Sequence, residues 1–376
     1  VSVLYCLMRL LIALILVAAA TAIDISLAKR QFVEFKQKFN RRYPGAKEEA
    51  RRFKIFVENL QVAERLQSSN PHAKFGVNAF TDISESEFKG RHNLQHHLKQ
   101  RAAAKTRNFL EAPGGSVVTK IDWRQRGAVT PVKDQGECGS CWSFSVTGNI
   151  EGQWFLAGNS LVSLSEQQLV SCDTIDSGCG GGFQDDAFEW LFFNTGGWIA
   201  TDSSYPYVSG SGVAPACNKS EWTRGAQITS YADIARDETV MAAQVGATGP
   251  ISVSLDASSF QTYVSGILTD CISVEIDHAV LIVGFDDTYN PPYWIVKNSW
   301  GADWGEGGYI RVAKGSNQCL IKNMPTTAFV NGSSPVNPTP APAVPTSSPT
   351  AAPSTPPTLS PPTPSPPTPS PPTPSP

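Results

Sequence analysis

Cysteine is the residue that most restricts how this chain of 376 residues can fold. Eight are present, and seven of them lie in one stretch: Cys138, Cys141, Cys172, Cys179, Cys217, Cys271 and Cys319. Six of the seven can pair as three disulfides, whose connectivity the spacing leaves open, and one thiol is left over. The leftover thiol is a candidate reactive group.

An N-terminal targeting segment supplies the oxidising route that such bridges need. Residues 8–22 join a basic start to a short apolar run and a small-residue cleavage site after Ala22. This pattern predicts a secretory signal peptide over 1–22, with Met8 as the expected start and Cys6 before or within it. A buried helix is the alternative. The apolar run is shorter than the roughly 20 residues of a membrane span, so no span is expected.

Charge divides the rest of the chain into three parts. Residues 23–111, the basic segment, carry 18 Lys and Arg against 10 Asp and Glu, a net charge of +8. Residues 112–330, the acidic segment, carry 11 against 23, a net charge of −12, and residues 331–376 carry none. Opposite charges favour association of the first two parts, although independently solvated surfaces would have the same composition. Neither part has the clustered basic face of a nucleic-acid-binding protein.

The last part of the chain is rich in proline. Between Pro335 and Pro376, 19 of 42 residues are proline, a composition that cannot form a packed core and favours extended polyproline II. We expect a spacer or an O-glycosylated stalk, whose repeat stops in mid-unit as a truncated sequence would. Asn218 and Asn331 each begin an N-glycosylation sequon.

The basic segment is predicted to be mostly helical. Helical spacing relates the side chains of Glu48, Arg52, Ile55, Phe56 and Asn59. Ser84 and Glu87 have the spacing of a capping box that opens a second, short helix. An exposed, cleavable linker is expected over 91–107.

The acidic segment has helix patterns first and strand patterns later. A first helix is predicted over 141–157, with a stop at Gly158. A second helix is predicted to begin after a cap at Ser165, and a third is predicted over 185–193. Strands are predicted over 251–255, 279–285, 293–296 and 309–312. This order predicts an α+β fold with two subdomains, in a segment long enough for a large core.

Cys141, His278 and Asn298 are the candidate catalytic residues. Cys141, in the stretch Gln135-Gly-Glu-Cys-Gly-Ser-Cys-Trp142, opens a predicted helix, whose free N–H groups and dipole would lower the pKa of the thiol. A thiolate attacks a carbonyl carbon, and an imidazolium protonates the leaving amine. His278 is the single histidine of the acidic segment. Asn298, within Lys-Asn-Ser-Trp-Gly, can orient that imidazole as a neutral partner.

These stretches resemble the motifs of papain-family cysteine proteases, specifically the cathepsin-L-like proteases of trypanosomatid protozoa (the cruzipain group). The resemblance covers about residues 30–330. It implies a papain-like fold of class α+β, in which a helical subdomain and a β-barrel-like subdomain enclose the active-site cleft, preceded by a helical propeptide. It also implies a cysteine endopeptidase, a hydrolase that uses no cofactor and no metal.

By this resemblance Cys141 is the nucleophile, His278 the general base and acid, and Asn298 the residue that orients the imidazole. The Gln135 side chain and the Cys141 N–H would form the oxyanion hole, and Trp300 would cover the hydrogen bond between His278 and Asn298. The implied disulfides are Cys138–Cys179, Cys172–Cys217 and Cys271–Cys319, which leave Cys141 as the free thiol.

The resemblance also implies a pocket for the second substrate side chain before the cleaved bond (P2). Its residues are Gly182, which would pair with the substrate backbone, the walls Phe183, Gln184, Ser254 and Ile276, and the floor Met324. Asn323 is the alternative floor. Cruzipain-like enzymes carry a Glu there, which can meet an arginine. Met324 cannot pair with a guanidinium, and burying an unpaired cation is costly, so Leu, Phe or Val is expected at P2 rather than Arg.

The basic segment resembles the inhibitory propeptide of the family, with a complete Gly-x-Asn-x-Phe-x-Asp motif over 76–82. The helical motif matches at Glu48, Arg52, Phe56 and Asn59 but departs from the family at Ala63 and Gln67. The expected domains are a propeptide over 23–111, a peptidase domain over 112–330, with the mature start between 112 and 120, and a tail over 331–376.

Acid should activate such a precursor. Low pH protonates carboxylates of the acidic segment and charges the four histidines of the basic segment, which weakens the attraction between the two. We therefore expect slow processing near neutral pH and self-processing in acid. The expected location is the secretory pathway, ending in a lysosome-like acidic compartment or outside the cell.

Other functions fit single features. Cys138-Gly-Ser-Cys141 alone has the pattern of a redox dithiol, a zinc site would need further His and Cys residues, and an inactive binding homologue would have lost Cys141 or His278. The family implies instead a monomer that acts on protein and peptide substrates and binds no nucleic acid. Its own propeptide and cystatin-like proteins are the expected inhibitors.

Overall fold

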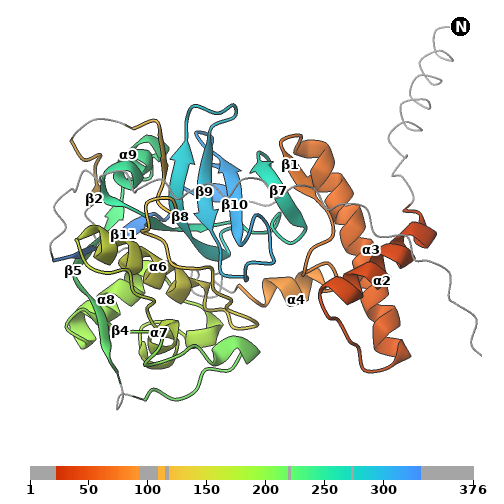
Figure 1. Cartoon of the computed structure of the whole chain (residues 1–376), viewed down its shortest axis with the longest axis horizontal. Helices are drawn as coiled ribbons and strands as arrows, with labels where there is room; N and C mark the ends of the chain where they lie inside the picture. The colour runs from red at the N-terminus through yellow and green to blue at the C-terminus, as the bar shows by residue number, and fades with distance from the viewer. Residues whose placement is uncertain (1–22, 93–108, 115–117, 219–221, 272–274, 332–376) are drawn as a thin grey trace, which may run out of the picture. The chain divides into compact units, whose positions relative to one another are not determined.

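The structure is a computed structural model that describes residues 23–92, 109–114, 118–218, 222–271 and 275–331. The predictions of a signal peptide over 1–22, of a linker over 93–107 and of a proline-rich tail lie outside these residues. Figure 1 shows the described elements in chain order, coloured from red to blue.

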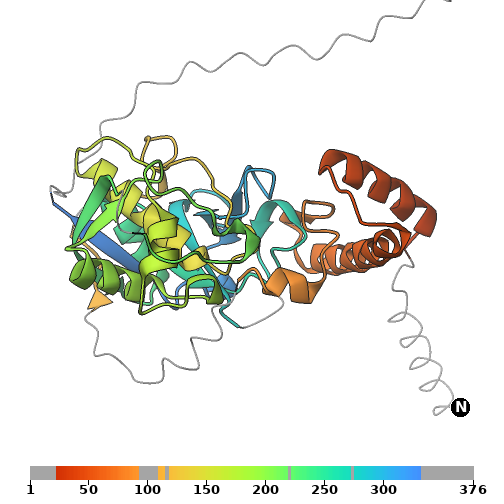
Figure 2. The same ribbon diagram turned by 90° about the horizontal axis from the view of Figure 1, so that it is seen from below.

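Two aromatic-rich helices begin the basic segment: α2 (Ile25–Lys38) and α3 (Ala46–Ser69). They pack through phenylalanine rings, with the centroids of Phe32 and Phe35 both 5.3 Å from that of Phe56. Figure 2 shows the two helices next to each other. Edge-to-face and tilted ring pairs of this kind stabilise a small core beyond the area that they bury.

The predicted helical stripe and the predicted capping box are both confirmed. Phe56 and Asn59 are buried on α3. The short helix α4 (Glu85–Lys89) begins at Ser84, whose hydroxyl accepts from the Glu87 N–H while the Glu87 carboxylate accepts from the Ser84 N–H. This reciprocal pair satisfies two N–H groups that a helix start leaves free.

Residues 70–83, the docking region, join the basic segment to the sheet of the acidic segment. Strand β1 (Ala73–Phe75) pairs antiparallel with β7 (Tyr263–Leu268), as Figure 1 shows. Asn70 Oδ1 accepts from the N–H groups of Thr269 (2.9 Å) and Asp270 (2.8 Å). The docking region therefore binds largely through the peptide backbone of its partner.

The acidic segment begins with a helical half, formed by α6 (Cys141–Leu156), α7 (Glu166–Cys172) and α8 (Gln184–Asn194). All three helices confirm the predictions. Gly158, with φ of +96°, follows the end of α6, and the Ser165 hydroxyl caps α7. The first 13 residues of α6 are all buried, because this helix lies between the other helices and the sheet.

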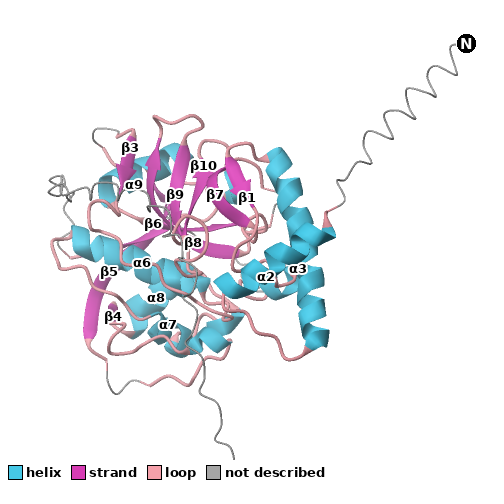
Figure 3. Cartoon of the chain, turned by 45° about the vertical axis from the view of Figure 1, so that its right-hand side comes forward, coloured by secondary structure: helices cyan, strands magenta, loops and turns pink. Residues whose placement is uncertain are grey.

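The sheet half confirms the four predicted strands to within one residue at either end. They are β6 (Ile251–Leu255), β8 (His278–Asp286), β9 (Tyr293–Lys297) and β10 (Tyr309–Ala313). Strand β8 is buried along its whole length, with β6 and β9 as its antiparallel neighbours. Figure 3 shows these four strands in magenta on one side of α6 and the helices α7 and α8 on the other.

Four longer elements were not predicted: β5 (Arg224–Ile234), α9 (Glu238–Thr248), β7 (Tyr263–Leu268) and β11 (Thr326–Val330). Strand β11 pairs antiparallel with β5, so a long strand precedes the first predicted one, at residue 251. The remaining elements are short: β2 (Phe109–Leu110), β3 (Lys120–Asp122), β4 (Trp198–Ala200), and the 3₁₀ turns Gly178–Gly180, Ser209–Ser211 and Gln318–Leu320.

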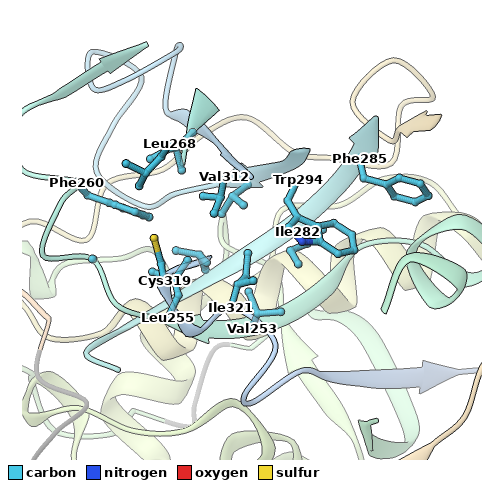
Figure 4. Close-up of a cluster of buried hydrophobic side chains, with 14 of the residues drawn as sticks. Val253, Leu255, Phe260, Leu268, Ile282, Phe285, Trp294, Val312, Cys319 and Ile321 are labelled. Carbon is cyan, nitrogen blue, oxygen red and sulfur yellow. The ribbon is translucent and has the colours of Figure 1, made fainter. Parts of the chain in front are cut away.

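Separate apolar clusters support the two halves. The sheet cluster includes Val253, Leu255, Phe260, Ile282, Trp294, Val312 and Ile321, which Figure 4 shows gathered together. The helical cluster includes Trp142 and Phe188 and extends to β11. Disulfides join Cys138–Cys179, Cys172–Cys217 and Cys271–Cys319, the pairs that the resemblance implies, and Cys141 is the free cysteine of the described residues.

Candidate active site

Cys141 is the first residue of α6, and its side chain is fully buried. The turn that leads into the helix is held by the Cys138–Cys179 disulfide. The Gly139 N–H also donates to the Cys179 carbonyl (3.0 Å). These links place the thiol at a fixed point at the start of the helix.

The start of α6 meets the start of β8 at this thiol. Further along α6, the Ser145 hydroxyl donates to the Val280 carbonyl of β8 (2.7 Å). The N–H of Ala279, the residue after His278, hydrogen-bonds the Cys141 sulfur. Residues 137 positions apart in the chain therefore meet at one point, because a buried helix crosses a buried strand.

Burial raises the pKa of the Cys141 thiol to about 12, although the N–H groups of Ala279 and Trp142 lower it. The prediction of a lowered pKa is therefore wrong for the chain with its basic segment in place. A thiolate removed from water loses more solvation than the helix start can replace. The thiol is neutral while the cleft is covered.

His278 opens β8, and Asn298 follows the neighbouring strand β9. His278 Nε2 lies 2.8 Å from Asn298 Oδ1, which also accepts from the Ser299 N–H (2.8 Å). Because an amide oxygen only accepts, Nε2 carries the proton and Nδ1 is left as an acceptor. Nδ1 is buried without a hydrogen-bond partner in the described part of the chain, so it can receive a proton from a thiol.

Trp300 covers this pair. Its ring stacks on the imidazole of His278, with centroids 4.6 Å apart and planes inclined by 22°. Burial lowers the pKa of His278 to about 4. The covered site thus holds a neutral thiol and a neutral imidazole rather than an ion pair.

Gln135 lies on the loop before α6 and is fully buried. The Ser299 hydroxyl donates to its Oε1 (2.6 Å), and its backbone N–H donates to the Ser299 carbonyl (2.9 Å). These bonds direct Nε2 to two carbonyl oxygens, of Cys138 (2.9 Å) and of Arg91 in the basic segment (2.7 Å). The Gln135 Nε2–H is thus a fixed donor, directed at the point where the Arg91 carbonyl oxygen now lies.

A buried ionic network lies behind the cleft, and the sequence analysis did not identify it. Lys133 Nζ contacts the carboxylates of Glu151 (3.1 Å) and Glu166 (2.6 Å). Lys297, the residue before Asn298, is also buried there, and burial lowers its pKa to about 8. Glu151 was the available signal, because a carboxylate inside a predicted buried helix needs a partner.

The residues assigned to the P2 pocket come from four parts of the chain, and three of them share an apolar cluster with Cys141. Gln184 Nε2 donates to the Val253 carbonyl (2.9 Å), and the Ser254 hydroxyl donates to Gln184 Oε1 (3.1 Å). Gly182 is buried just before α8. One apolar cluster contains Cys141, Phe183, Ile276 and Met324. Because Gln184 and Ser254 hydrogen-bond each other, the apolar side chains are left as the lining of the predicted pocket.

Arg91 and His92 of the basic segment lie in this cleft. The ring of His92 is fully buried, 5.3 Å from the ring of His278 and 5.5 Å from that of Trp300. Its Nδ1 lies 3.7 Å from the Asp277 carboxylate. The prediction of an exposed linker from residue 91 is therefore wrong at its start, because Arg91 and His92 pack against the candidate catalytic residues.

Other kinds of site find no support in the described ranges. No group of three or more His, Cys, Asp and Glu side chains there is arranged to hold a metal ion. None of the helices in the same ranges is both long and apolar enough to cross a membrane.

Two family models match the chain, in the order of its two segments. Residues 117–329 match the model of the papain family cysteine protease. Residues 32–88 match the cathepsin propeptide inhibitor domain (I29). The first match contains the whole candidate site, and the second contains α3, the docking region and most of α4.

Relatives of known sequence support the same family. A cysteine proteinase of Trypanosoma brucei brucei is 50% identical over 300 residues, which are 80% of this chain and 67% of the relative. Cysteine proteinase B of Leishmania mexicana is 48% identical over 351 residues, 89% of this chain and 76% of the relative. Both come from trypanosomatids, as the motifs indicated.

Solved structures of precursors share the fold. Digestive procathepsin L 3 of Tenebrio molitor larval midgut has a TM-score of 0.70 at 33% identity, over 81% of this chain and 99% of that one. The proform of the ragweed pollen cysteine protease Amb a 11 has a TM-score of 0.72 at 30% identity, over 82% and 96%. The α+β, papain-like fold with a helical propeptide is thereby confirmed, and the chain belongs to the papain family of cysteine proteases and carries the inhibitory propeptide of that family.

Proposed function

We propose that the chain is the zymogen of an endopeptidase in which Cys141 attacks the peptide bond and His278 moves the proton. The observation that carries this proposal is the tautomer of His278. Asn298 Oδ1 holds the proton on Nε2, so the imidazole keeps a buried acceptor, Nδ1, for the thiol proton.

In the proposed reaction the Cys141 proton moves to His278 Nδ1, and the thiolate attacks the carbonyl carbon. The carbonyl oxygen becomes an oxyanion, held by the Gln135 Nε2–H and the Cys141 N–H. Loss of one such donor costs about 100- to 1,000-fold in rate. The imidazolium then protonates the leaving amine, and water deprotonated by His278 hydrolyses the thioester.

The precursor is latent in this proposal because the propeptide uses the same groups. The Arg91 carbonyl accepts the Gln135 hydrogen bond that an oxyanion would need. His92 packs against His278 and Trp300 in the space beside the nucleophile. A substrate cannot bind until these two residues leave.

Acid opens the cleft, we propose, by protonating two imidazoles. Burial and the neighbouring His278, with Arg91 and Lys89 adding to it, hold the pKa of His92 well below its usual value. Burial holds the pKa of His278 near 4. Both pKa values return toward about 6.5 when water enters, so opening takes up protons as the pH falls through this range.

Asp277 acts in the opposite direction. Burial raises the pKa of this carboxyl to about 7, so it carries a proton while covered and releases it when the cleft opens. Two protons gained and one lost leave a net uptake of about one. The open state is therefore favoured by up to about tenfold for each unit that the pH falls.

Net charge contributes less than the sequence analysis expected. Within the described residues one pair of opposite charges joins the propeptide to the peptidase domain, Arg91 with Glu137 (3.9 Å). His92 and Asp277 (3.7 Å) are close but both neutral while covered. Most propeptide ion pairs are internal, such as those of Arg52 with Glu48 and Glu87. Acid activation then depends on the cleft and not on the whole surface.

The proposed specificity follows from the floor of the P2 pocket. Met324 packs in the apolar cluster with Phe183 and Ile276, which favours Leu, Phe or Val over Arg. A Phe-Arg fluorogenic dipeptide should be cleaved at least about tenfold better than Arg-Arg, since an unpaired buried cation is costly. Met324→Glu should raise Arg-Arg cleavage near neutral pH, with Asn323→Glu as the matched control. Equal cleavage of both dipeptides by the wild type would refute the assignment.

The catalytic assignment is tested with Cys141→Ser and His278→Ala precursors. Both should fold and be secreted, show no peptidase activity, and fail to process themselves at acid pH. A thiol-reactive epoxide should label one residue of the processed wild-type enzyme and abolish its activity. Activity in purified His278→Ala, or maturation of Cys141→Ser by itself, would contradict the assignment; labelling without peptidase activity would favour a redox or binding protein.

The remaining features of the proposal concern route and partners. We propose a signal peptide over 1–22, a propeptide over 23–111, a peptidase domain over 112–330 and a tail from 331. The enzyme would be monomeric, cleave proteins and peptides, and be inhibited by cystatin-like proteins. Opening of the cleft in acid fits a lysosome-like compartment or an acidic space outside the cell. Mass spectrometry of the secreted protein would define the mature start and the occupancy of Asn218 and Asn331.

A further inference from the structure

Two buried carboxyl groups lie on the loop between α7 and α8. Asp173 follows the last residue of α7, Asp176 comes three residues later, and each is 9% exposed. Asp173 Oδ1 accepts from the N–H groups of Ile175 (2.7 Å) and Asp176 (3.2 Å). The disulfides of Cys172 and Cys179 hold this loop on both sides of the pair.

Asp176 supports the edge of the substrate cleft. Its Oδ1 accepts a hydrogen bond from the Phe183 N–H (2.8 Å). A methyl group added at Gly182 would lie 2.6 Å from the Asp176 carboxyl carbon and from Oδ1, so the carboxyl fills the space directly behind Gly182. Asp176 therefore lies behind the two residues assigned to the backbone and the side chain of the P2 residue.

The other carboxyl oxygens of the pair need a proton. Oδ2 of Asp173 and Oδ2 of Asp176 are buried, and no donor of the described residues reaches them. The two side chains lie within hydrogen-bonding distance of each other. Two ionised carboxylates cannot make this contact, because neither can donate and burial leaves their repulsion poorly screened. One proton turns the contact into a strong O–H···O⁻ hydrogen bond.

The surroundings of the pair tolerate one negative charge but not two. The Phe183 N–H and the positive end of helix α8 stabilise a single carboxylate at Asp176. Asp186, in the first turn of α8, adds a further negative charge close by. The side-chain charge that acts on the pair from outside is therefore also negative.

We propose that Asp173 and Asp176 share one proton, and that this proton positions Gly182 and Phe183 to bind the P2 residue of the substrate. The inference rests on the proposed function, since it requires a peptide in the cleft. When the proton leaves, two like charges push the loop apart and displace the Phe183 N–H from its acceptor. Both aspartates are positioning residues, because neither touches a reacting atom.

The shared proton is held in acid and lost as the pH rises. Burial raises the pKa of Asp173 to about 6, and burial together with the neighbouring carboxylate raises the pKa of Asp176 well above its ordinary value. The shared proton is the last to leave, at the higher of the two values, so substrate binding should weaken only as the pH rises beyond about 6. The propeptide is proposed to leave in acid, so the activated enzyme would still hold this proton.

The test measures KM and kcat of the processed enzyme for the Phe-Arg dipeptide between about pH 5 and about pH 9. Once the pH passes the pKa of Asp176, the wild-type KM should rise by up to about tenfold per pH unit, with a smaller change in kcat. In Asp176→Asn the amide oxygen still accepts from Phe183 and the amide N–H donates to Asp173 without a titrating proton. Its KM should stay flat over this range, whereas that of Asp176→Ala should be high throughout.

Exposed Asp303→Asn is the matched control and should follow the wild type. If Asp176→Asn fails to fold, Asp173→Asn gives the same test from the other side of the pair, since its amide can donate to Asp176. An Asn variant with the wild-type dependence of KM on pH would overturn the inference, and so would a flat wild-type KM. Failure of the proposed function differs from both, because then either the wild type would not cleave the dipeptide at all or Cys141→Ser would still cleave it.

Discussion

The propeptide contacts the peptidase domain in two regions whose chemistry differs. In the docking region, β1 pairs with β7 and Asn78 Nδ2 donates to the carbonyls of Gln261 (2.7 Å) and Tyr263 (3.0 Å). In the cleft region, residues 88–92, the partners include ionisable groups, such as the imidazole of His278 and the Asp277 carboxylate beside His92. Neutral hydrogen bonds keep their strength as the pH falls, whereas contacts between covered imidazoles do not.

This difference would let one propeptide bind tightly through the docking region and still uncover the active site when the pH falls. In the proposed activation, acid opens the cleft region first, while the docking region keeps the propeptide bound. The opened chain then lies next to the nucleophile of its own molecule. A first cleavage within one molecule follows from this arrangement, because the local concentration of the tethered segment is high.

The largest effect is expected from Asn78→Ala in the docking region. It leaves two buried carbonyls without a donor, at about 1–3 kcal/mol each, so the propeptide should hold the cleft closed about 30- to 25,000-fold less well. The rate of epoxide labelling of Cys141 in the full precursor measures this at pH 7 and pH 5. Lys74→Ala, an exposed change on β1, is the control. If Asn78→Ala lost latency at pH 5 but not at pH 7, the docking region would be pH-dependent like the cleft region, and the contrast between the two would be wrong.

A smaller effect is expected from His92→Phe, which keeps a ring beside Trp300 but removes its titrating nitrogens. Processing near pH 5 should slow by about tenfold, with less change near pH 7, because the proton uptake on opening falls by about one. Gel analysis of precursor processing against pH gives the slope. The exposed His72→Asn precursor should process like the wild type. If the processing rate of His92→Phe depended on pH as that of the wild type does, the proton taken up on opening would bind to another group.

The smallest effect is expected from Glu137→Gln. The Arg91–Glu137 pair is 3.9 Å apart and the Glu137 side chain is 69% exposed, so the pair should contribute well under about 1 kcal/mol and be screened by salt. Labelling of the precursor should accelerate less than about fivefold. A larger, salt-dependent acceleration would restore the net charge of the two segments as a main cause of latency.

The fold was predictable where one segment of sequence determines its own structure. Helix α6 has a regular apolar spacing and a glycine stop, and α4 has both residues of its capping box. Strand β8 is a nearly continuous apolar run, and β6 alternates apolar residues with serine. In contrast, β5 alternates irregularly between buried and exposed positions and contains Gly225 and Asp233. Its strand character therefore depends on pairing with β11, whose partner residues are 93 to 102 positions away.

The sequence indicates which residues are candidates for the site, but not how buried they are or how their pKa values are shifted. Motifs identified Cys141, His278 and Asn298 because their types and order are specific to the chemistry. The raised pKa of Cys141 and the burial of His92 depend on the path that the propeptide takes across the cleft, which no local pattern contains. The Asp173–Asp176 contact likewise needs the turn between them and the position of Phe183.

Strand β7 changes its character when the propeptide leaves. In the precursor it lies between β1 and β10. Without β1, the backbone groups of residues 263–266 have no strand partner on that side, and the sheet gains an open edge. Such edges add strands from other chains, which leads to self-association or to capture of extended peptides. In the precursor β1 keeps this sheet edge covered.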